Sequence, residues 1–180
     1  MRPAKVDPVK LVSSVISGDP ALMEVALGKL ESSFGRLDYL SPILPFDRTG
    51  YYEAEMGRDL SRRIVSFEEL IEPGELAEIK LRTNSVEDDF LSQGGKRRVN
   101  VDPGYLTLHN LVLASCKNFA HRVYIGRGVY AEVTLLYRKD CYRPLEWTYP
   151  DYRDETMRGI FKEIRARYAR RLGRGGKGVQ

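Results

Sequence analysis

Four short strand-like segments crowd the second half of the chain, and they constrain the fold more than any other feature. They cover residues 97–102, 111–117, 121–125 and 129–138. Gly126-Arg127-Gly128 joins the last two as a tight hairpin, which makes them antiparallel neighbours. The first half adds predicted strands at 9–17, 36–46, 51–56 and 62–70. Because strands and helices do not alternate regularly, we expect an α+β domain with a mostly antiparallel sheet.

Three helices are predicted beside this sheet. Asp19 is a good N-cap for a first helix over 20–34, and a second apolar stripe with helical spacing runs over 73–90. Asp151 is expected to cap a last helix that continues to residue 172. We expect the helices to pack on one face of the sheet, in a ferredoxin-like or other two-layer sandwich.

The composition is that of one folded domain. Of the 180 residues, 42% are hydrophobic and 30% are charged. No apolar run approaches the ~18 to 20 residues needed to span a bilayer, so no membrane segment is expected. We expect a single domain over 1–172 and a flexible, glycine-rich basic tail over 173–180. The N-terminal apolar segment is too short for a secretory signal, and two cysteines imply no disulfide framework, so a cytoplasmic location is expected.

The segment 97–102 places polar side chains together on one face of a predicted strand. Val99 and Val101 would face the core, because side chains alternate along a strand. Arg98, Asn100 and Asp102 would then project from the other side at ~6 to 7 Å intervals. A solvated outer face of the sheet explains the same pattern without any ligand.

Glu132 is a carboxylate in the middle of an otherwise apolar predicted strand. A buried charge requires a partner, and the candidates in the neighbouring segments are Arg98, Lys117, His121 and Arg122. A structural ion pair and a catalytic acid are both consistent with this position.

Together these residues predict a site for a phosphorylated or otherwise anionic small molecule, with nucleotides among the candidates. The proposed roles are anion binding for Arg98, Lys117 and Arg122, orientation for Asn100 and Asp102, and proton transfer for His121 or Glu132. The sequence leaves open whether the protein is an enzyme.

Glu53 and Glu55 form the one carboxylate pair considered for a metal. In a strand over 51–56 they would share a face, a spacing that suits two carboxylates holding Mg²⁺. Two exposed charges on an edge strand are the alternative interpretation.

Positive charge is concentrated at the C-terminus. Residues 153–180 hold nine Lys or Arg against three Asp or Glu, a surplus of 6, so the first 152 residues carry 4 − 6 = −2. Arginines over 153–177 therefore predict, as the rival function, an RNA- or ribosome-associated binding module. A solvated helix face favoured by the helix dipole explains the same charges. A third possibility is an interaction subunit, which a large exposed apolar patch would indicate.

Nucleotide-binding and hydrolase motifs are missing from the sequence. It has no Walker loop, no G-x-G-x-x-G opening a helix and no G-x-S-x-G elbow. The strings YYEAEMG, SFEEL, LRTNSVE, LEWTYPDYR and the long segment over 97–137 resemble a prokaryotic family of similar length catalogued as a domain of unknown function. Some members of that family carry the label "GTP-binding protein", yet this chain has neither a phosphate loop nor an N-K-x-D guanine reader. The resemblance implies a single domain and supplies no catalytic residue.

Overall fold

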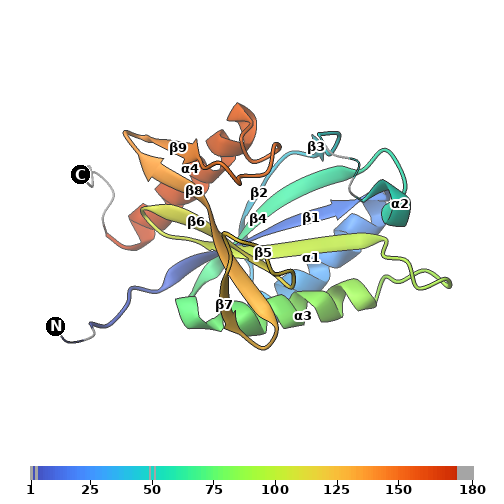
Figure 1. The fold of residues 1–180 in the computed structure, drawn as a ribbon, viewed down its shortest axis with the longest axis horizontal. Helices are drawn as coiled ribbons and strands as arrows, with labels where there is room; N and C mark the ends of the chain where they lie inside the picture. The colour runs from blue at the N-terminus through green and yellow to red at the C-terminus, as the bar shows by residue number, and fades with distance from the viewer. Residues whose placement is uncertain (1, 3, 49, 51, 174–180) are drawn as a thin grey trace.

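The computed structural model describes residues 2, 4–48, 50 and 52–173, and it shows a single α+β domain built on one nine-stranded sheet (Figure 1). The strands are β1 (Val9–Ser17), β2 (Leu37–Leu40), β3 (Leu44–Pro45), β4 (Ser61–Ile71), β5 (Val99–Leu106), β6 (Asn110–Ser115), β7 (Val123–Gly126), β8 (Val129–Arg138) and β9 (Cys141–Pro144). Their order is β2-β4-β1-β5-β6-β8-β7, with β3 beside β4 and β9 beside β8. Every pairing among the described strands is antiparallel, as predicted.

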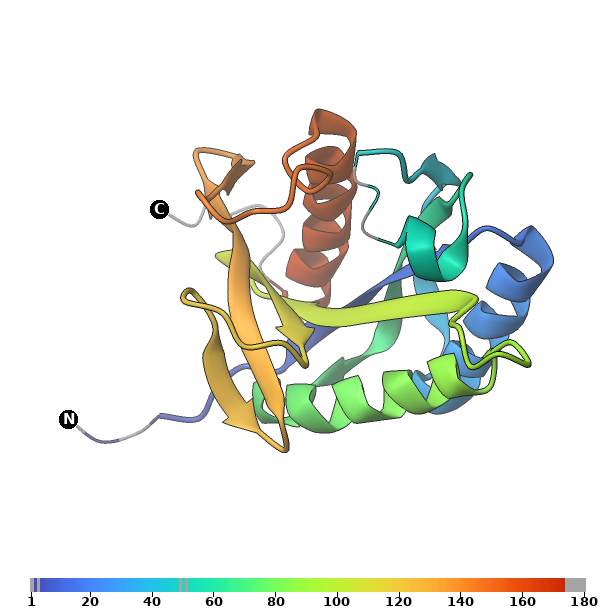
Figure 2. The same ribbon diagram turned by 45° about the vertical axis from the view of Figure 1, so that its right-hand side comes forward.

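The helices lie on both faces of this sheet, which gives it three layers instead of the expected two. They are α1 (Pro20–Phe34), α2 (Glu53–Met56), α3 (Leu76–Asp88), preceded by a 3₁₀ turn at Pro73–Glu75, and α4 (Glu155–Arg171). Leu11 on β1 belongs to the core with α1 and α3, whereas its neighbour Val12 belongs to the core with α4. Adjacent strand residues point to opposite faces, so α4 covers the face that α1 and α3 leave open (Figure 2).

The helix starts follow the predicted capping chemistry in one case and depart from it in another. The Asp19 carboxylate accepts hydrogen bonds from the backbone amides of Ala21 and Leu22, at 2.9 and 3.3 Å. At α4 the cap is Asp154, which accepts from the amide of Thr156 at 2.9 Å. The prediction that Asp151 caps this helix was wrong, because its carboxylate pairs with an arginine of β4 instead.

Residues 52–56 do not form the strand that was predicted over 51–56. Within the described residues, Glu53–Met56 form the single turn of α2, which ends at Gly57 with φ +87°. A six-residue alternation is too short to exclude one helical turn, and here Tyr52 packs its ring on Phe46 at a centroid distance of 5.7 Å. The irregular edge strand expected over 36–46 is confirmed as the two short strands β2 and β3.

β5 continues through Pro103-Gly104, where the sequence had suggested that the strand stops. β1 pairs with β5 at eight positions, but β6 pairs with it only from Gly104 to Leu106. The contact at Gly104 is very close, since a Cβ there would lie 2.3 Å from the carbonyl oxygen of Val112. Over 99–103, β5 therefore has no described strand partner on the β6 side, and the sheet opens between these two strands.

Candidate ligand-binding cavity

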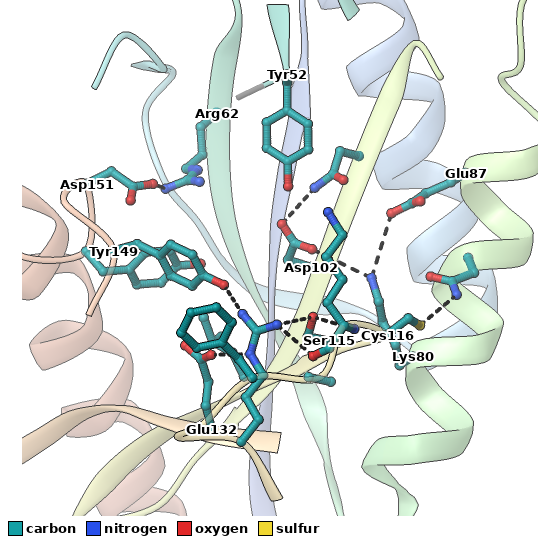
Figure 3. A pocket seen from close by; sticks show the side chains of 18 of the residues that line it. Tyr52, Arg62, Lys80, Glu87, Asp102, Ser115, Cys116, Glu132, Tyr149 and Asp151 are labelled. Carbon is teal, nitrogen blue, oxygen red and sulfur yellow. Dashed lines mark hydrogen bonds and ion pairs between the residues drawn. The ribbon is translucent and has the colours of Figure 1, made fainter. Parts of the chain in front are cut away.

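A cavity of about 830 Å³ occupies the opening between β5 and β6 (Figure 3). Side chains from α3, β5, β6 and β8 line one part of it. The rest of the wall comes from the loop over 149–152, from residues of the segment 116–122, and from Phe46, Arg48, Tyr52, Arg62 and Arg97. Its volume falls within the ~300 to 1,000 Å³ typical of small-molecule sites.

Two side chains of α3 replace the missing strand along the edge of β5. The Lys80 ammonium donates to the carbonyl oxygen of Val101 at 3.0 Å, and the Val101 amide donates to Glu87 at 2.7 Å. Pro103, the next residue with the same orientation, has no N–H to satisfy. The sheet can therefore stay open here without leaving the backbone of Val101 unpaired.

A polar network continues from this edge toward α2. Arg97 donates to both carboxylate oxygens of Glu55, at 2.7 and 2.6 Å, and to the side-chain oxygen of Asn100 at 2.8 Å. The Asn100 amide donates in turn to Asp102 at 2.7 Å. Burial raises the pKa of Glu87, whereas the hydrogen bonds from Arg97 lower the pKa of Glu55.

Arg122 is held at the opposite end of the cavity. Its Nε donates to Glu132 at 2.7 Å, and its Nη1 donates to Ser115 Oγ at 3.1 Å and to the Lys117 carbonyl at 2.7 Å. Its Nη2 donates to the hydroxyl of Tyr149. Burial and, to a smaller extent, the charge of Glu132 raise the pKa of Tyr149, so this phenol stays neutral at neutral pH.

Arg62 forms a second fixed guanidinium, on the β4 side of the cavity. Its Cζ lies 4.6 Å from the ring centre of Phe46 and 5.2 Å from that of Tyr152. Asp151 accepts a hydrogen bond from its Nη1. The buried Nε has no hydrogen-bond partner among the described residues. Because Tyr149 and Asp151 are two residues apart, a single loop holds an arginine on each side of the cavity.

Five of the seven predicted ligand-site residues line this one cavity, namely Asn100, Asp102, Lys117, Arg122 and Glu132. Arg98 does not line it, and its guanidinium lies instead 3.3 Å from the carboxylate of Asp19. His121 lies beside the cavity wall, with Nε2 3.0 Å from Glu132 and its ring stacked on Trp147. The proton-transfer roles of His121 and Glu132 stay predictions.

Several residues of the cavity were missed by sequence reasoning. They are Arg62, Lys80, Glu87, Arg97, Tyr149 and Asp151. The signal available for two of them was a polar residue on the apolar side of a helix, since Lys80 and Glu87 are both buried in α3. Arg62 and Asp151 are 89 residues apart, and no local pattern connects them.

The carboxylates predicted to hold Mg²⁺ lie on α2 and are paired with arginines. Glu55 binds Arg97, and Glu53 is half-exposed with its carboxylate 3.9 Å from Arg58. Within the described ranges, no cluster of three or more His, Cys, Asp or Glu side chains is placed to hold a metal ion. The magnesium role of Glu53 and Glu55 stays a prediction.

Two arginines of α4 are engaged with the protein itself. Arg165 donates to the Leu108 carbonyl at 2.8 Å and lies over the ring of Tyr137 at 3.6 Å. Arg167 donates to the Asp38 carbonyl at 2.9 Å. These contacts occupy N–H donors of the two arginines, and the RNA partner expected for the 153–177 segment stays a prediction.

Other sequence-based predictions receive partial tests. The tail predicted over 173–180 lies outside the described residues except for Gly173. Cys116 and Cys141 are both free thiols, and the cytoplasmic location expected from them stays a prediction. Among the described helices, none combines the length and apolarity needed to cross a membrane.

Comparison with known proteins identifies a family and nothing more specific. The sequence model of a family described as "Domain of unknown function (DUF4416)" matches residues 7–168, a range that includes every residue lining the cavity. No curated protein and no solved structure matches the chain. The cavity therefore has to be interpreted from its own chemistry.

Proposed function

The chain belongs to the DUF4416 family, and we propose that it binds a small phosphorylated or otherwise anionic molecule in the cavity between β5 and β6. The observation that carries the proposal is the opening of the sheet, where fixed cations from β4 and from the segment before β7 line one partly open cavity. Nucleotides and sugar phosphates are the ligand classes that fit both its volume and its charge.

The charges of the cavity support an anionic ligand. Its lining contains six Lys or Arg (Arg48, Arg62, Lys80, Arg97, Lys117 and Arg122) against five Asp or Glu (Glu87, Asp88, Asp102, Glu132 and Asp151), a surplus of one positive charge. Three of the carboxylates are paired with cations of the lining, so they would not repel an anionic ligand as isolated charges. Glu132 binds Arg122, Asp151 binds Arg62 and Glu87 pairs with Lys80.

The two fixed arginines would supply most of the recognition. A guanidinium presents donors in a planar fork that matches the oxygens of a phosphate or carboxylate. Glu132 and Tyr149 hold Arg122 in one orientation, so its remaining N–H is aimed before the ligand arrives. Such preorganisation lowers the entropic cost of binding. The exposed Lys117 adds a flexible cation on the same wall.

Groups on the β5 side would orient the remainder of the ligand. Asn100 and Asp102 supply an amide and a carboxylate, which together accept and donate hydrogen bonds. Tyr52, Phe119 and Tyr149 supply ring surfaces for an apolar or planar part. Glu132 has the role of positioning Arg122. If the protein is an enzyme, Glu132 or His121 would in addition transfer a proton.

A thermal-shift screen tests the proposal. The purified chain is heated with inorganic phosphate, pyrophosphate, AMP, GTP and ribose 5-phosphate, each at matched ionic strength. A ligand that binds only the folded state increases the free energy of unfolding by RT ln(1 + [L]/Kd), and the melting temperature rises as a result. We expect at least one member of this panel to stabilise the protein.

Two lysine variants localise the effect. Lys117→Ala removes a cation from the cavity wall, whereas Lys162→Ala removes an exposed cation from α4. We expect the ligand-induced shift to fall in Lys117→Ala and to stay unchanged in Lys162→Ala. Indifference to the whole panel, or equal losses in the two variants, would contradict the proposed site.

A further inference from the structure

Exposed aromatic side chains gather beside the cavity, and we call Phe119, Tyr124, Trp147 and Tyr149 the aromatic strip. Their exposed fractions are 64%, 59%, 38% and 41%. Large rings with this much exposure mark a surface that binds something. Phe119 and Tyr149 also line the cavity, so the strip begins at its wall.

Ring contacts join two members of the strip, and strand register places a third. His121 connects two of its members, because its ring lies 5.3 Å from that of Phe119 and 5.2 Å from that of Trp147. On the hairpin, Tyr124 faces Tyr130 with their rings 5.4 Å apart. Tyr130 lies two residues before Glu132 on β8, so Tyr124, its partner across the strands, projects from the same face as Glu132. Tyr124 therefore lies on the outermost strand of the sheet, on the same face as the cavity residue Glu132.

The segment that carries two of the four rings, Phe119 and Tyr124, contains more positive than negative side chains. Residues 103–139 contain a single carboxylate, Glu132, which is buried and paired with Arg122. The same 37 residues contain five Lys or Arg: Lys117, Arg122, Arg127, Arg138 and Lys139. Of these cations, Lys117 and Arg122 line the cavity, where they would attract a polyanion. Arg127 is paired with Glu78, and Arg138 and Lys139 lie at the end of β8 that is opposite to the hairpin.

Exposed rings in a cationic setting are the chemistry that single-stranded nucleic acids recognise. Bases stack on aromatic side chains whatever their sequence, while the phosphates are neutralised by Lys and Arg. A base-paired duplex cannot use the rings in this way, because its bases are already stacked. A purely apolar protein partner would gain nothing from the cations.

We infer that the ligand of the cavity is the terminal nucleotide of a single-stranded nucleic acid, whose following bases stack along the aromatic strip. The inference rests on the proposed function and extends it, because it specifies how the phosphorylated ligand continues outside the cavity. Arg122 and Lys117 hold the terminal phosphate, and Phe119 and Tyr124 provide successive stacking surfaces. This interface is separate from the α4 arginines.

Calorimetric titration of the full chain with uridylate hexanucleotides tests the inference. The arms are RNA and DNA, each with a 5′-phosphate, a 3′-phosphate or no terminal phosphate, together with a duplex and AMP. We expect single strands to bind at least about tenfold more tightly than AMP, because additional bases stack. One terminal phosphate should strengthen binding, and the duplex should bind more weakly than the single strand.

Substitutions separate the strip from the cavity. Tyr124→Ala removes a ring that does not line the cavity, so it should weaken hexanucleotide binding about tenfold and leave AMP binding unchanged. Tyr124→Phe keeps the ring and should retain affinity. Ile43→Ala, at an apolar residue that is 55% exposed elsewhere on the surface, is the matched control and should change neither affinity.

The possible failures are distinguishable. If AMP binds but hexanucleotides bind no more tightly, the inference is overturned and the cavity function stands. Equal affinity for duplex and single strand, or an unchanged hexanucleotide affinity in Tyr124→Ala, would also overturn it. If neither AMP nor any hexanucleotide binds, the inference fails together with the proposed nucleotide ligand. Self-association of the chain through the strip, abolished by Tyr124→Ala, would assign this surface to a second copy and overturn the inference.

Discussion

The Lys80 ammonium donates to the carbonyl oxygen of Val101 at 3.0 Å, in the position where a neighbouring strand would have donated an amide. In folded proteins, the edge of a strand is usually paired with another strand, covered by another element or protected by charged side chains. Here a helix side chain completes the edge and leaves the space beside it open. The cavity therefore depends on α3 as much as on the sheet.

Replacing this lysine should destabilise the protein clearly. Lys80→Met leaves the Val101 carbonyl without its side-chain donor and removes a cation from beside Glu87. The site is buried, because the side chains of Lys80 and Glu87 are each 7% exposed. We expect a loss of about 2–3 kcal/mol in the free energy of unfolding, measured with urea. Lys29→Met, which breaks an exposed pair with Asp89, should cost less than about 1 kcal/mol. Similar losses in both variants would show that Lys80 does not complete the β5 edge.

Two glycine substitutions should change stability in opposite directions. Gly104→Ala places a Cβ 2.3 Å from the Val112 carbonyl oxygen, and both atoms are fixed to the backbone, so β5 and β6 must separate. We expect it to cost at least about 1–3 kcal/mol, as overpacking does. Gly28→Ala lies within α1 with no atom within 4 Å of the new methyl, and should stabilise by about 0.5–1 kcal/mol. Thermal denaturation of both variants checks the prediction, and a tolerated Gly104→Ala would contradict the close approach of the two strands.

Glu87 should give stability a characteristic pH dependence. Burial raises the pKa of Glu87 in the folded state above its ordinary value of 4.5, so the native protein holds this proton more tightly than the unfolded chain. Stability contributed by this group must then fall as pH rises from 4.5 through the folded pKa. Urea unfolding between pH 4 and 7 should show this loss relative to Glu87→Gln, which keeps an acceptor for the Val101 amide. A wild type that gains stability relative to the variant over this range would show the opposite sign.

The Arg122–Glu132 pair should show strong coupling. Their side chains are 8% and 2% exposed, so Arg122→Ala leaves a buried carboxylate without its main cation. We expect this variant to lose about 3–5 kcal/mol of stability. Adding Glu132→Gln should recover part of that loss, because the uncompensated charge disappears. A double-mutant cycle measures the coupling, and additive effects would mean that the two residues do not act as a pair.

The sequence predicted the part of the cavity that depends on strand periodicity. Side-chain alternation placed Asn100 and Asp102 on one face, and the position of Glu132 within an apolar strand led to Arg122 as one of its candidate partners. All four residues line the cavity. The antiparallel α+β architecture followed from the same period-two pattern and from the order of the elements.

The remainder depends on contacts that no local pattern encodes. Asp151 satisfied the chemistry of a helix cap, but its partner Arg62 on β4 could not be identified before the fold was known. Pro103 was interpreted as the end of a strand, whereas the open edge of β5 allows a proline within it. The presence of α4 on the second face likewise depends on long-range packing of apolar residues.

The most direct test of the central claim is a titration of the ¹⁵N-labelled protein with AMP and with pyrophosphate, followed by amide NMR. Binding in the opening between β5 and β6 predicts shifts concentrated at 101–102, 115–122 and 149–152. Shifts confined to α1 or the outer edge at β2, or no shifts with either compound, would contradict a ligand site in this cavity.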